Sequence, residues 1–419
     1  MSNIYLAWLL AGLWTFAQTH CISNYTEGHS QPSPAEVLYN LPHHNIVPGN
    51  VDFTFKFYCQ VSLGEARNNI LFSPLSISTA LSMLLLGAKH RTQSQLLSGL
   101  SFNQTEISGQ EICEGFNNSL HLLNDPSNEI ELNLGNALFI DEEMKPLKKF
   151  VHDAKHFYNS DISHTNFKNS EQAEEQINYY IEKKTNGQFV DVIRGLETDV
   201  SMVLVNYMFM KAYWKNPFSF KNTREDYFFV DEQTTVRVPM MFSNALYKTY
   251  NDTDLSCQLV EIPYKGTTSA LFILPEPGKM KQVEDALEKG ILLKWLHSVE
   301  EQRINLHLPR FTIHAKYVLR GLLRRMGITD IFTDEADLSG ITGKPELKVS
   351  KAVHQVHLSV HENGTEAAAA ATFDETVSNS LSPIIIFNRP FVLIISESRS
   401  NSILFMGRII NPNGTGRHY

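Results

Sequence analysis

A segment of small residues separates two strand-like parts of this chain. Residues 364–379 read GTEAAAAATFDETVSN and carry almost no side chain that would need burial. Before them, residues 356–361 alternate between apolar and polar, the pattern of a half-buried strand. After them come IIIFNRPFVLIIS and ILFMGRIINP, apolar runs of buried-strand length. Alanine favours a helical turn, but a weakly structured segment of this length inside a compact domain is usually functional.

Motifs elsewhere in the chain give this segment a context. They are LFSPLSISTALSMLLLGA at 71–88, LVNYMFMKAYWKNPF at 204–218, VPMMF at 238–242 and ADLSGIT at 336–342. With GTEAAAAA, FNRPF and SILFMGRIINP, they resemble segments of serpins, in serpin order. The resemblance covers residues 46–412 and has the style of the extracellular antitrypsin-like group, which includes antichymotrypsin and the corticosteroid and thyroxine carriers. It implies the α+β serpin fold, with three β-sheets, about nine helices and an exposed reactive-centre loop.

The domain organisation follows from the same resemblance. A length of 419 residues alone suggests two or three domains, but no linker, charge block or repeat divides the chain. We expect a single serpin domain at 46–419, with its reactive loop at about 364–383. The first residues include IYLAWLLAGLWTFA, an apolar run of signal-peptide length that is short for a membrane anchor. Residues 1–20 are predicted to be a signal peptide and residues 21–45 a flexible tail, with no membrane span.

Several features favour a secreted glycoprotein. The chain has four cysteines, Cys21, Cys59, Cys113 and Cys257. If Cys21 leaves with the signal peptide, the odd number that remains cannot form a complete disulfide framework. The net charge of −9 argues against nucleic acid as the main partner. The protein is also expected to be a monomer. Six Asn-x-Ser/Thr acceptors support extracellular localisation; they are Asn24, Asn103, Asn117, Asn251, Asn363 and Asn413.

Motifs of catalysis are missing from the sequence. It has no G-x-S-x-G elbow, no H-E-x-x-H, no Cys-x-x-Cys pair and no complete Walker loop, so we do not expect an enzyme. Of the clustered histidines His354, His357 and His361, only the last two would share one face of a strand. Two histidines without a nearby cysteine or carboxylate make a poor zinc site. No metal or cofactor is therefore expected.

The serpin resemblance implies a mechanical function for the alanine-rich segment. A target protease cuts the exposed loop, and the cut loop inserts as a new strand into the main sheet, which distorts the acyl-enzyme. The hinge of the loop must have a flexible backbone and small side chains that fit between packed strands. Gly364 supplies backbone freedom, and no proline interrupts the run. A glycan on Asn363 would obstruct insertion. The predicted hinge residues are Glu362, Gly364, Thr365, Glu366, Ala367, Ala368, Ala369, Ala370 and Ala371.

Other residues match the machinery that lets the sheet open. Trp214 corresponds to the aromatic residue where insertion begins, and Glu362 and Arg310 correspond to the ion pair that closes this site. Buried polar groups of this kind are hydrogen-bonded to each other, and breaking such a network frees strands to separate. Ordinary core packing is the alternative for each. The cluster beneath the centre of the sheet is expected to contain Ser73, Ser76, Asn206 and His354.

Specificity is expected at the bond that the protease attacks. Family spacing from Glu362 places this bond at Ser378–Asn379, whereas counting back from Phe387 places it at Asn379–Ser380. Because residues 365–386 contain no lysine or arginine, a trypsin-like target is disfavoured. Leu381 would suit a chymotrypsin-like protease, and Val377 or Ser378 an elastase-like one. A cysteine protease that cleaves after Asn379 is a further alternative.

A non-inhibitory serpin is the rival interpretation. The sequence LSCQLVEIPY around Cys257 resembles a strand of the hormone carriers, so the protein could carry a small hydrophobic ligand. A tissue-restricted secretory glycoprotein without inhibition is also possible. The carrier pocket would lie between the helix at 291–302 and the segment after Ile395. An amphipathic helix shows the same pattern for packing alone. Its candidate lining residues are Lys294, Trp295 and Arg399.

Overall fold

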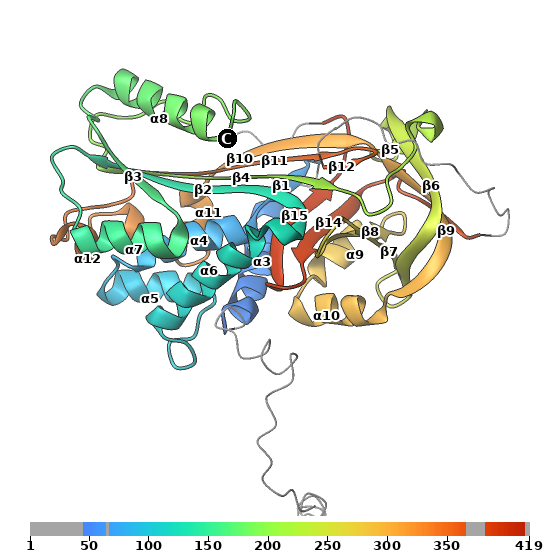
Figure 1. Ribbon diagram of the computed structural model, residues 1–419, viewed down its shortest axis with the longest axis horizontal. Helices are drawn as coiled ribbons and strands as arrows, with labels where there is room; N and C mark the ends of the chain where they lie inside the picture. The colour runs from blue at the N-terminus through green and yellow to red at the C-terminus, as the bar shows by residue number, and fades with distance from the viewer. Residues whose placement is uncertain (1–44, 64–66, 366–381, 415–419) are drawn as a thin grey trace, which may run out of the picture. The chain divides into compact units, whose positions relative to one another are not determined.

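The computed structural model describes residues 45–63, 67–365 and 382–414 (Figure 1). The predicted signal peptide and almost all of the predicted tail lie outside these ranges. The fold is mixed α+β, as expected, and its described part contains ten α-helices. Within the described ranges, no helix is long and apolar enough to cross a bilayer.

A six-stranded sheet forms one layer, in the order β10-β11-β4-β2-β3 with β12 beside β4. The central strand β4 is buried along almost its whole length, which explains its continuous apolar run. β4 runs antiparallel to β2 and parallel to β11. The strands are β2 (Ile130–Asp141), β3 (Asp161–Thr165), β4 (Met202–Tyr213), β10 (Phe311–Val318), β11 (Lys351–Val360) and β12 (Gly364–Thr365).

The remaining strands form one continuous nine-stranded sheet, where the resemblance implied two separate sheets. The reason is the length of β6, which pairs with β5 at its start, with β9 along its middle and with β7 at its end. The strands are β1 (Ile70–Phe72), β5 (Arg224–Phe229), β6 (Thr235–Asp252), β7 (Cys257–Pro263), β8 (Thr268–Pro275), β9 (Glu300–Pro309), β13 (Ile384–Ile386), β14 (Phe391–Glu397) and β15 (Ser402–Ile409).

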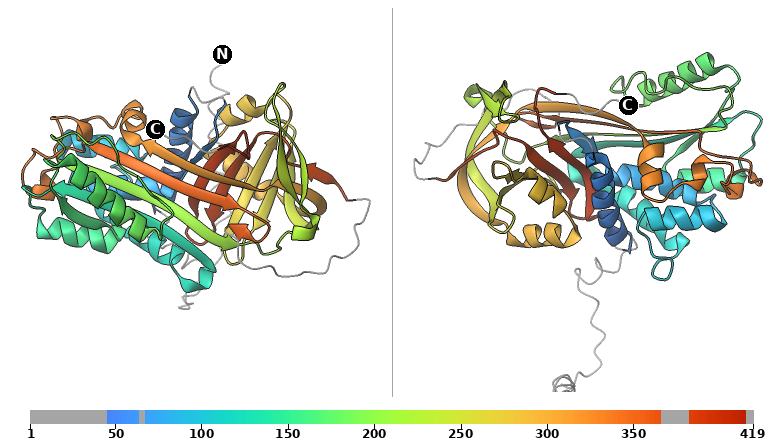
Figure 2. Two further views of the ribbon diagram at one scale, coloured as in Figure 1. Left: turned by 90° about the horizontal axis from the view of Figure 1, so that it is seen from above. Right: turned by 180° about the vertical axis from the view of Figure 1, so that it is seen from behind.

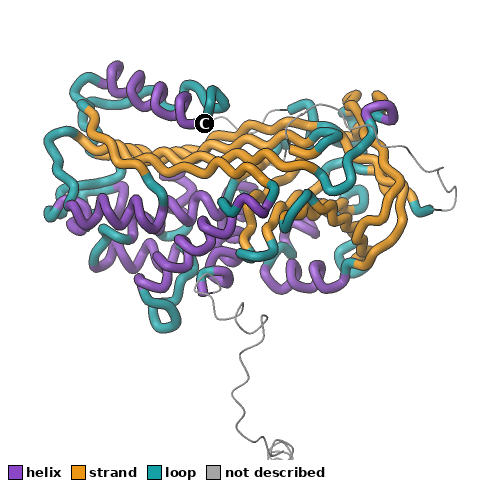
Figure 3. The backbone as a smooth tube through the Cα atoms, viewed as in Figure 1, coloured by secondary structure: helices purple, strands orange, loops and turns teal. Residues whose placement is uncertain are grey.

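Helices cover both faces of the six-stranded sheet. α8 lies across one face, and α4, α6 and α7 lie on the other (Figures 1 and 2). The tube in Figure 3 shows the same layers. The α-helices are α3 (Val47–Ser62), α4 (Pro74–Leu85), α5 (His90–Gly99), α6 (Gly109–Leu123), α7 (Lys148–Tyr158), α8 (Ser170–Lys184), α9 (Met280–Asp285), α10 (Lys289–Ser298), α11 (Leu319–Arg325) and α12 (Ser339–Thr342); the short 3₁₀-helices are η2 (Pro126–Asn128), η3 (Phe220–Asn222) and η4 (Asp330–Phe332).

The buried helix α4 connects the two sheets. Ser73 caps its first turn by accepting a hydrogen bond from the Ser76 backbone N–H, and Pro74 occupies the first helical position, where no N–H is needed. All residues of α4 are buried. The serines on this helix can therefore form hydrogen bonds only with other groups inside the protein.

Candidate functional site

The first two residues of the predicted reactive loop form a strand of the six-stranded sheet. In β12, Gly364 pairs with Tyr213 and Thr365 with Ala212 of β4, antiparallel to it. On its other edge, Ala212 pairs with Ile130 of β2. β12 therefore lies on the β11 edge of β4, just beyond the last β4–β11 pair, His357–Phe209. An inserted loop strand would continue from this position between β11 and β4.

A tight turn brings β12 to this place. The backbone groups of His361 and Gly364 exchange two hydrogen bonds, of 2.7 and 3.1 Å, so the chain reverses directly after β11. Gly364 has a φ of +140°. A Cβ there would lie 2.1 Å from the Ala212 carbonyl oxygen. Only glycine fits this backbone conformation and this close approach.

Thr365 is buried in the structure and hydrogen-bonded. Its side chain is 1% exposed, and its hydroxyl oxygen lies 2.9 Å from the Tyr264 hydroxyl. The Tyr264 ring is stacked on Trp214, with centroids 4.1 Å apart and an interplanar angle of 14°. Burial raises the pKa of Tyr264, so its hydroxyl stays neutral at physiological pH. The hinge is thus anchored to an aromatic pair beneath the top of the sheet.

Trp214, predicted to mark the start of insertion, lies directly at this hinge. Its indole N–H donates to the His361 carbonyl at 2.8 Å, and its backbone N–H donates to the Asn363 carbonyl at 2.8 Å. The side chain is fully buried. Trp214 therefore fixes the turn between β11 and β12 from two sides.

The predicted ion pair at the hinge is present. Nη1 of Arg310 lies 3.7 Å from Oε1 of Glu362, whose side chain is 1% exposed. The same oxygen accepts a hydrogen bond of 2.8 Å from the Thr223 hydroxyl, and the Phe218 backbone N–H donates to the Glu362 carbonyl. Because the Arg310 side chain is 41% exposed, water screens the pair. The half-buried Thr223 hydroxyl is the closer partner of Glu362.

The four residues predicted beneath the centre of the sheet form one hydrogen-bonded network, which we term the shutter network. All are fully buried. The Ser73 backbone N–H donates to His354 Nε2 at 3.1 Å, His354 Nδ1 lies 2.6 Å from Asn206 Oδ1, and Asn206 Nδ2 donates to Ser76 Oγ at 2.6 Å. A fifth residue, Asn136 of β2, accepts a hydrogen bond from Asn206 at 2.7 Å. The network consequently joins α4 to three strands of the sheet.

The donors and acceptors of this network follow from one backbone group. Since the Ser73 N–H requires an acceptor, His354 Nε2 carries no proton and Nδ1–H donates to the Asn206 oxygen. Burial lowers the pKa of His354 to about 3, which keeps the ring neutral. The His354–Asn206 bond crosses from β11 to β4, so it would have to break if a new strand separated them.

The other two clustered histidines lie elsewhere. His357 contacts His314 of β10, with nitrogen atoms 3.0 Å apart, and Ser359 bonds His361 at 2.7 Å. The described residues contain no group of three or more His, Cys, Asp or Glu side chains arranged to hold a metal ion.

The predicted ligand-pocket residues belong to two separate groups. Trp295 is fully buried and donates its indole N–H to Asp252 at 2.8 Å, and Lys294 forms an ion pair with the same carboxylate at 3.0 Å. Arg399 instead contacts Asp125 and Asn128 near the end of α6. Each of the three side chains is thus held by protein partners, which fits packing better than ligand contact.

The glycan acceptors differ in exposure. Asn103, Asn251 and Asn413 are exposed, Asn117 is half-buried, and Asn363 is only 6% exposed. Asn24 lies outside the described residues. So do the hinge residues from Glu366 to Ala371 and the proposed reactive-bond residues Ser378, Asn379 and Ser380.

Comparison with known proteins decides the family. The model of the family Serpin (serine protease inhibitor) matches residues 48–412. The chain belongs to the serpin family. Alpha-1-antiproteinase 2 of Equus caballus is 44% identical over 92% of this chain and 91% of its own length. Kallistatin of Homo sapiens is 40% identical over 97% of this chain and 98% of its own length.

Solved serpin structures have the same fold. Human thyroxine-binding globulin in complex with thyroxine has a TM-score of 0.84 at 39% identity, over 89% of this chain and 100% of that one. Human glycosylated kallistatin has a TM-score of 0.83 at 41% identity, over 89% and 99%. The relatives place this serpin in the antitrypsin-like group, as predicted.

Sequence reasoning missed three residues of this site. Tyr264, Thr223 and Asn136 each bond a residue that was predicted. Asn136 alone had a sequence signal, because it is a polar residue at the start of the buried run NALFI. Tyr264 and Thr223 lie in segments whose composition is ordinary for a strand end and a turn.

Proposed function

We propose that this serpin is a secreted inhibitor of a serine protease without trypsin-like specificity and that it acts by inserting its cut loop into the six-stranded sheet. The observation that carries the proposal is β12. Its two residues already occupy the place beside β4 that an inserting loop strand would fill first. The segment that follows, from Glu366 to Ala371, contains one glutamate and five alanines, and its sequence suits continued insertion.

The shutter network supports the same proposal. A strand that enters between β4 and β11 breaks the seven residue pairs from Lys351–Val203 to His357–Phe209 and the His354–Asn206 hydrogen bond. The new strand restores backbone pairing on both of its edges, so sheet hydrogen bonds are gained overall. Small side chains in the inserted segment keep the packing cost low. Insertion is therefore favourable once cleavage frees the loop.

The test is a protease panel that includes chymotrypsin-like, elastase-like and asparagine-specific enzymes. We expect one of them to form a complex with the serpin that survives SDS, because the acyl bond is trapped. Thr365→Arg places a charged, long side chain in the buried position beside Tyr264 and is expected to convert the protein into a substrate. Thr235→Arg, the same change at an exposed position of β6, is the matched control and is expected to keep inhibition. A panel without any SDS-stable complex would contradict the proposal.

A cavity supports a second candidate function, that of a carrier for a small hydrophobic ligand. It has a volume of about 410 Å³ and lies between the end of α10, β6 and β13, with Tyr250, Ser298, Gln302 and Ile384 among its lining. This volume is in the range of ligand pockets, and thyroxine-binding globulin is among the similar structures. Thyroxine titration with fluorescence detection tests it: saturable binding that Tyr250→Ala weakens supports a carrier, and no binding removes thyroxine as the ligand.

A further inference from the structure

Two histidines lie one turn apart on the exposed side of α7. His152 and His156 are at positions i and i+4, a spacing that places their side chains on the same face of a helix. Both residues are exposed, whereas Phe150, Ala154 and Tyr158 bury the opposite side of α7 in the core. The pair of imidazoles is therefore accessible from solvent.

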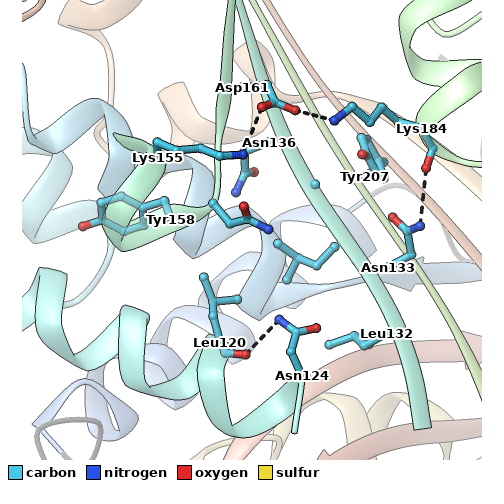
Figure 4. Close-up of a pocket in the computed structure, with 13 residues that line it drawn as sticks. Leu120, Asn124, Leu132, Asn133, Asn136, Lys155, Tyr158, Asp161, Lys184 and Tyr207 are labelled. Carbon is cyan, nitrogen blue, oxygen red and sulfur yellow. Dashed lines mark hydrogen bonds and ion pairs between the residues drawn. The ribbon is translucent and has the colours of Figure 1, made fainter. Parts of the chain in front are cut away.

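The pair is separate from the pocket that α7 borders. This pocket, drawn in Figure 4, lies between α6, α7 and β2, and α7 contributes Lys155 and Tyr158 to its lining. Neither His152 nor His156 lines it. The pair also belongs to a different element from the histidines in and next to β11, so it forms a distinct group on the surface of the protein.

The two imidazole rings lie close together. Their centroids are 5.8 Å apart, and their planes are inclined by 22°. The His156 ring also packs edge-on against Phe157, with centroids 4.7 Å apart. Because His156 is exposed, its ring can turn about the side-chain bonds and bring one nitrogen beside that of His152. Histidines at i and i+4 of one helix coordinate a common Zn²⁺ in H-E-x-x-H motifs, and the pair on α7 has the same spacing.

A carboxylate orients one of the two rings. Nδ1 of His152 lies 3.1 Å from Oδ1 of Asp153. Since an ionised carboxylate only accepts hydrogen bonds, Nδ1 carries the proton of the neutral ring and the lone pair is on Nε2. Metal-bound histidines commonly donate their other ring N–H to a carboxylate in this way, which fixes the ring and raises the basicity of the coordinating nitrogen. Asp153 thus prepares His152 to bind a metal ion through Nε2.

The charges around the pair are balanced. Lys149 forms an ion pair with Asp153, and Nζ of Lys155 lies 3.2 Å from Asp161. Each of these lysines is paired with a carboxylate, which reduces its repulsion of a dication. The donors that the pair offers are neutral nitrogens. Imidazole nitrogen suits Cu²⁺, Ni²⁺ and Zn²⁺, whereas Mg²⁺ and Ca²⁺ prefer oxygen ligands.

We propose that His152 and His156 form a surface site for a divalent transition-metal ion, Cu²⁺ or Zn²⁺, bound through one nitrogen of each imidazole. For His152 this nitrogen is Nε2. Because the described residues provide no third histidine, cysteine or carboxylate arranged as a ligand, water fills the remaining coordination positions, as it does in open metal sites. The site does not depend on loop insertion or on the proposed inhibitory function.

The test titrates full-length protein, prepared without a polyhistidine tag, with ZnCl₂ and CuCl₂ in a calorimeter. We expect saturable binding that is tighter for Cu²⁺ than for Zn²⁺, and no binding of Mg²⁺. His152→Gln and His156→Gln each remove one donor and are expected to weaken this binding at least about tenfold, because the second donor of a chelate binds intramolecularly. Glutamine is a good helix former, so both variants are expected to keep α7 folded.

Two further variants separate the proposed ligands from other residues. His297→Gln is the matched control, because His297 is an exposed histidine in the last turn of another helix, α10, and it is expected to bind as the unaltered protein does. Asp153→Asn keeps a hydrogen-bond acceptor for His152 but removes the charge. It is expected to weaken binding by less than the loss of either histidine does.

Electron paramagnetic resonance of bound Cu²⁺ identifies the ligands directly. Couplings from two imidazole nitrogens are expected in the unaltered protein, and from one in His152→Gln or His156→Gln. Unchanged binding in both of these variants would assign the ion to other histidines and overturn the proposal. Absence of saturable binding, or weaker binding in only one of the two variants, would also contradict a site that the two histidines share.

Discussion

The hydroxyl groups of Tyr264 and Thr365 lie 2.9 Å apart in a buried position, although 101 residues separate them in the chain. Thr365 is the second residue of β12, and Tyr264 is stacked on Trp214. The contact connects the start of the reactive loop to the core beneath the top of the six-stranded sheet. It explains how a short strand of two residues is held in place.

Tyr264→Phe is expected to loosen the hinge while keeping the stacked ring. The loss of one buried hydrogen bond costs about 1 kcal/mol, which corresponds to roughly fivefold more frequent opening of β12. Hydrogen exchange of the Thr365 amide measures this opening. Tyr247→Phe, which removes a hydrogen bond of 2.9 Å to Ser243, is the matched control. Exchange at Thr365 that is unchanged by Tyr264→Phe would contradict the anchoring role.

Gly364→Ala is expected to displace β12 from β4. The new Cβ would meet the Ala212 carbonyl at 2.1 Å, and the backbone has a φ of +140°, so the strain amounts to about 1–3 kcal/mol. The expected result is rapid exchange of the Thr365 amide and slower conversion after the loop is nicked. Gly109→Ala, at a helix position with open space around the glycine, is expected to change neither quantity.

The free energy of unfolding is expected to decrease at acidic pH because two histidines are buried. Burial lowers the pKa of His354 to about 3, and burial together with His314 and His361 lowers the pKa of His357 to about 4. The unfolded chain takes up these protons near pH 6.5, whereas the folded protein does so only near pH 3–4. The free energy of unfolding therefore decreases as pH falls from about 6.5 to 4, by up to ~1.4 kcal/mol per pH unit for each histidine.

Unfolding in urea at several pH values measures this dependence. His357→Gln is expected to make the slope shallower, because one of the two titrating groups is removed. An unchanged slope in that variant would show that His357 is protonated equally in the folded and unfolded states.

Asn363 is expected to stay unglycosylated, because it is 6% exposed in the turn that Trp214 holds. Asn103 and Asn251 are exposed and are expected to carry glycans. Glycopeptide mass spectrometry measures the occupancy of each acceptor. A glycan on Asn363 would contradict the buried turn, and Asn363→Gln would then be expected to speed loop insertion.

Local patterns predicted the parts of this fold that depend on neighbours in sequence. The alternation at 356–361 lies in and just after β11, and the apolar runs after the loop form β13, β14 and β15. The family resemblance placed His354 and Asn206 together, although they come from different strands. The pairing of Gly364 with Tyr213 could not be predicted, because the turn that positions Gly364 is also held by hydrogen bonds from the distant Trp214.

The predicted ligand pocket shows the limit of a helix pattern. In α10, Trp295 is buried and donates to Asp252, and an amphipathic helix has the same sequence pattern whether such residues pack in the core or line a cavity. Asn136 is the opposite case, since one buried polar residue on β2 connects the shutter network to a pocket that no sequence pattern indicated.

The measurement that tests loop insertion most directly needs no known target. The loop is nicked between residues 373 and 381 with a protease of broad specificity, and the melting temperatures of intact and nicked protein are compared. Insertion adds a strand to the six-stranded sheet, so the rise is expected to be far larger than the roughly 2–4 °C that 1 kcal/mol produces in a domain of 150–250 residues. An unchanged or lower melting temperature would show that the loop does not insert and that this serpin is not an inhibitor of this type.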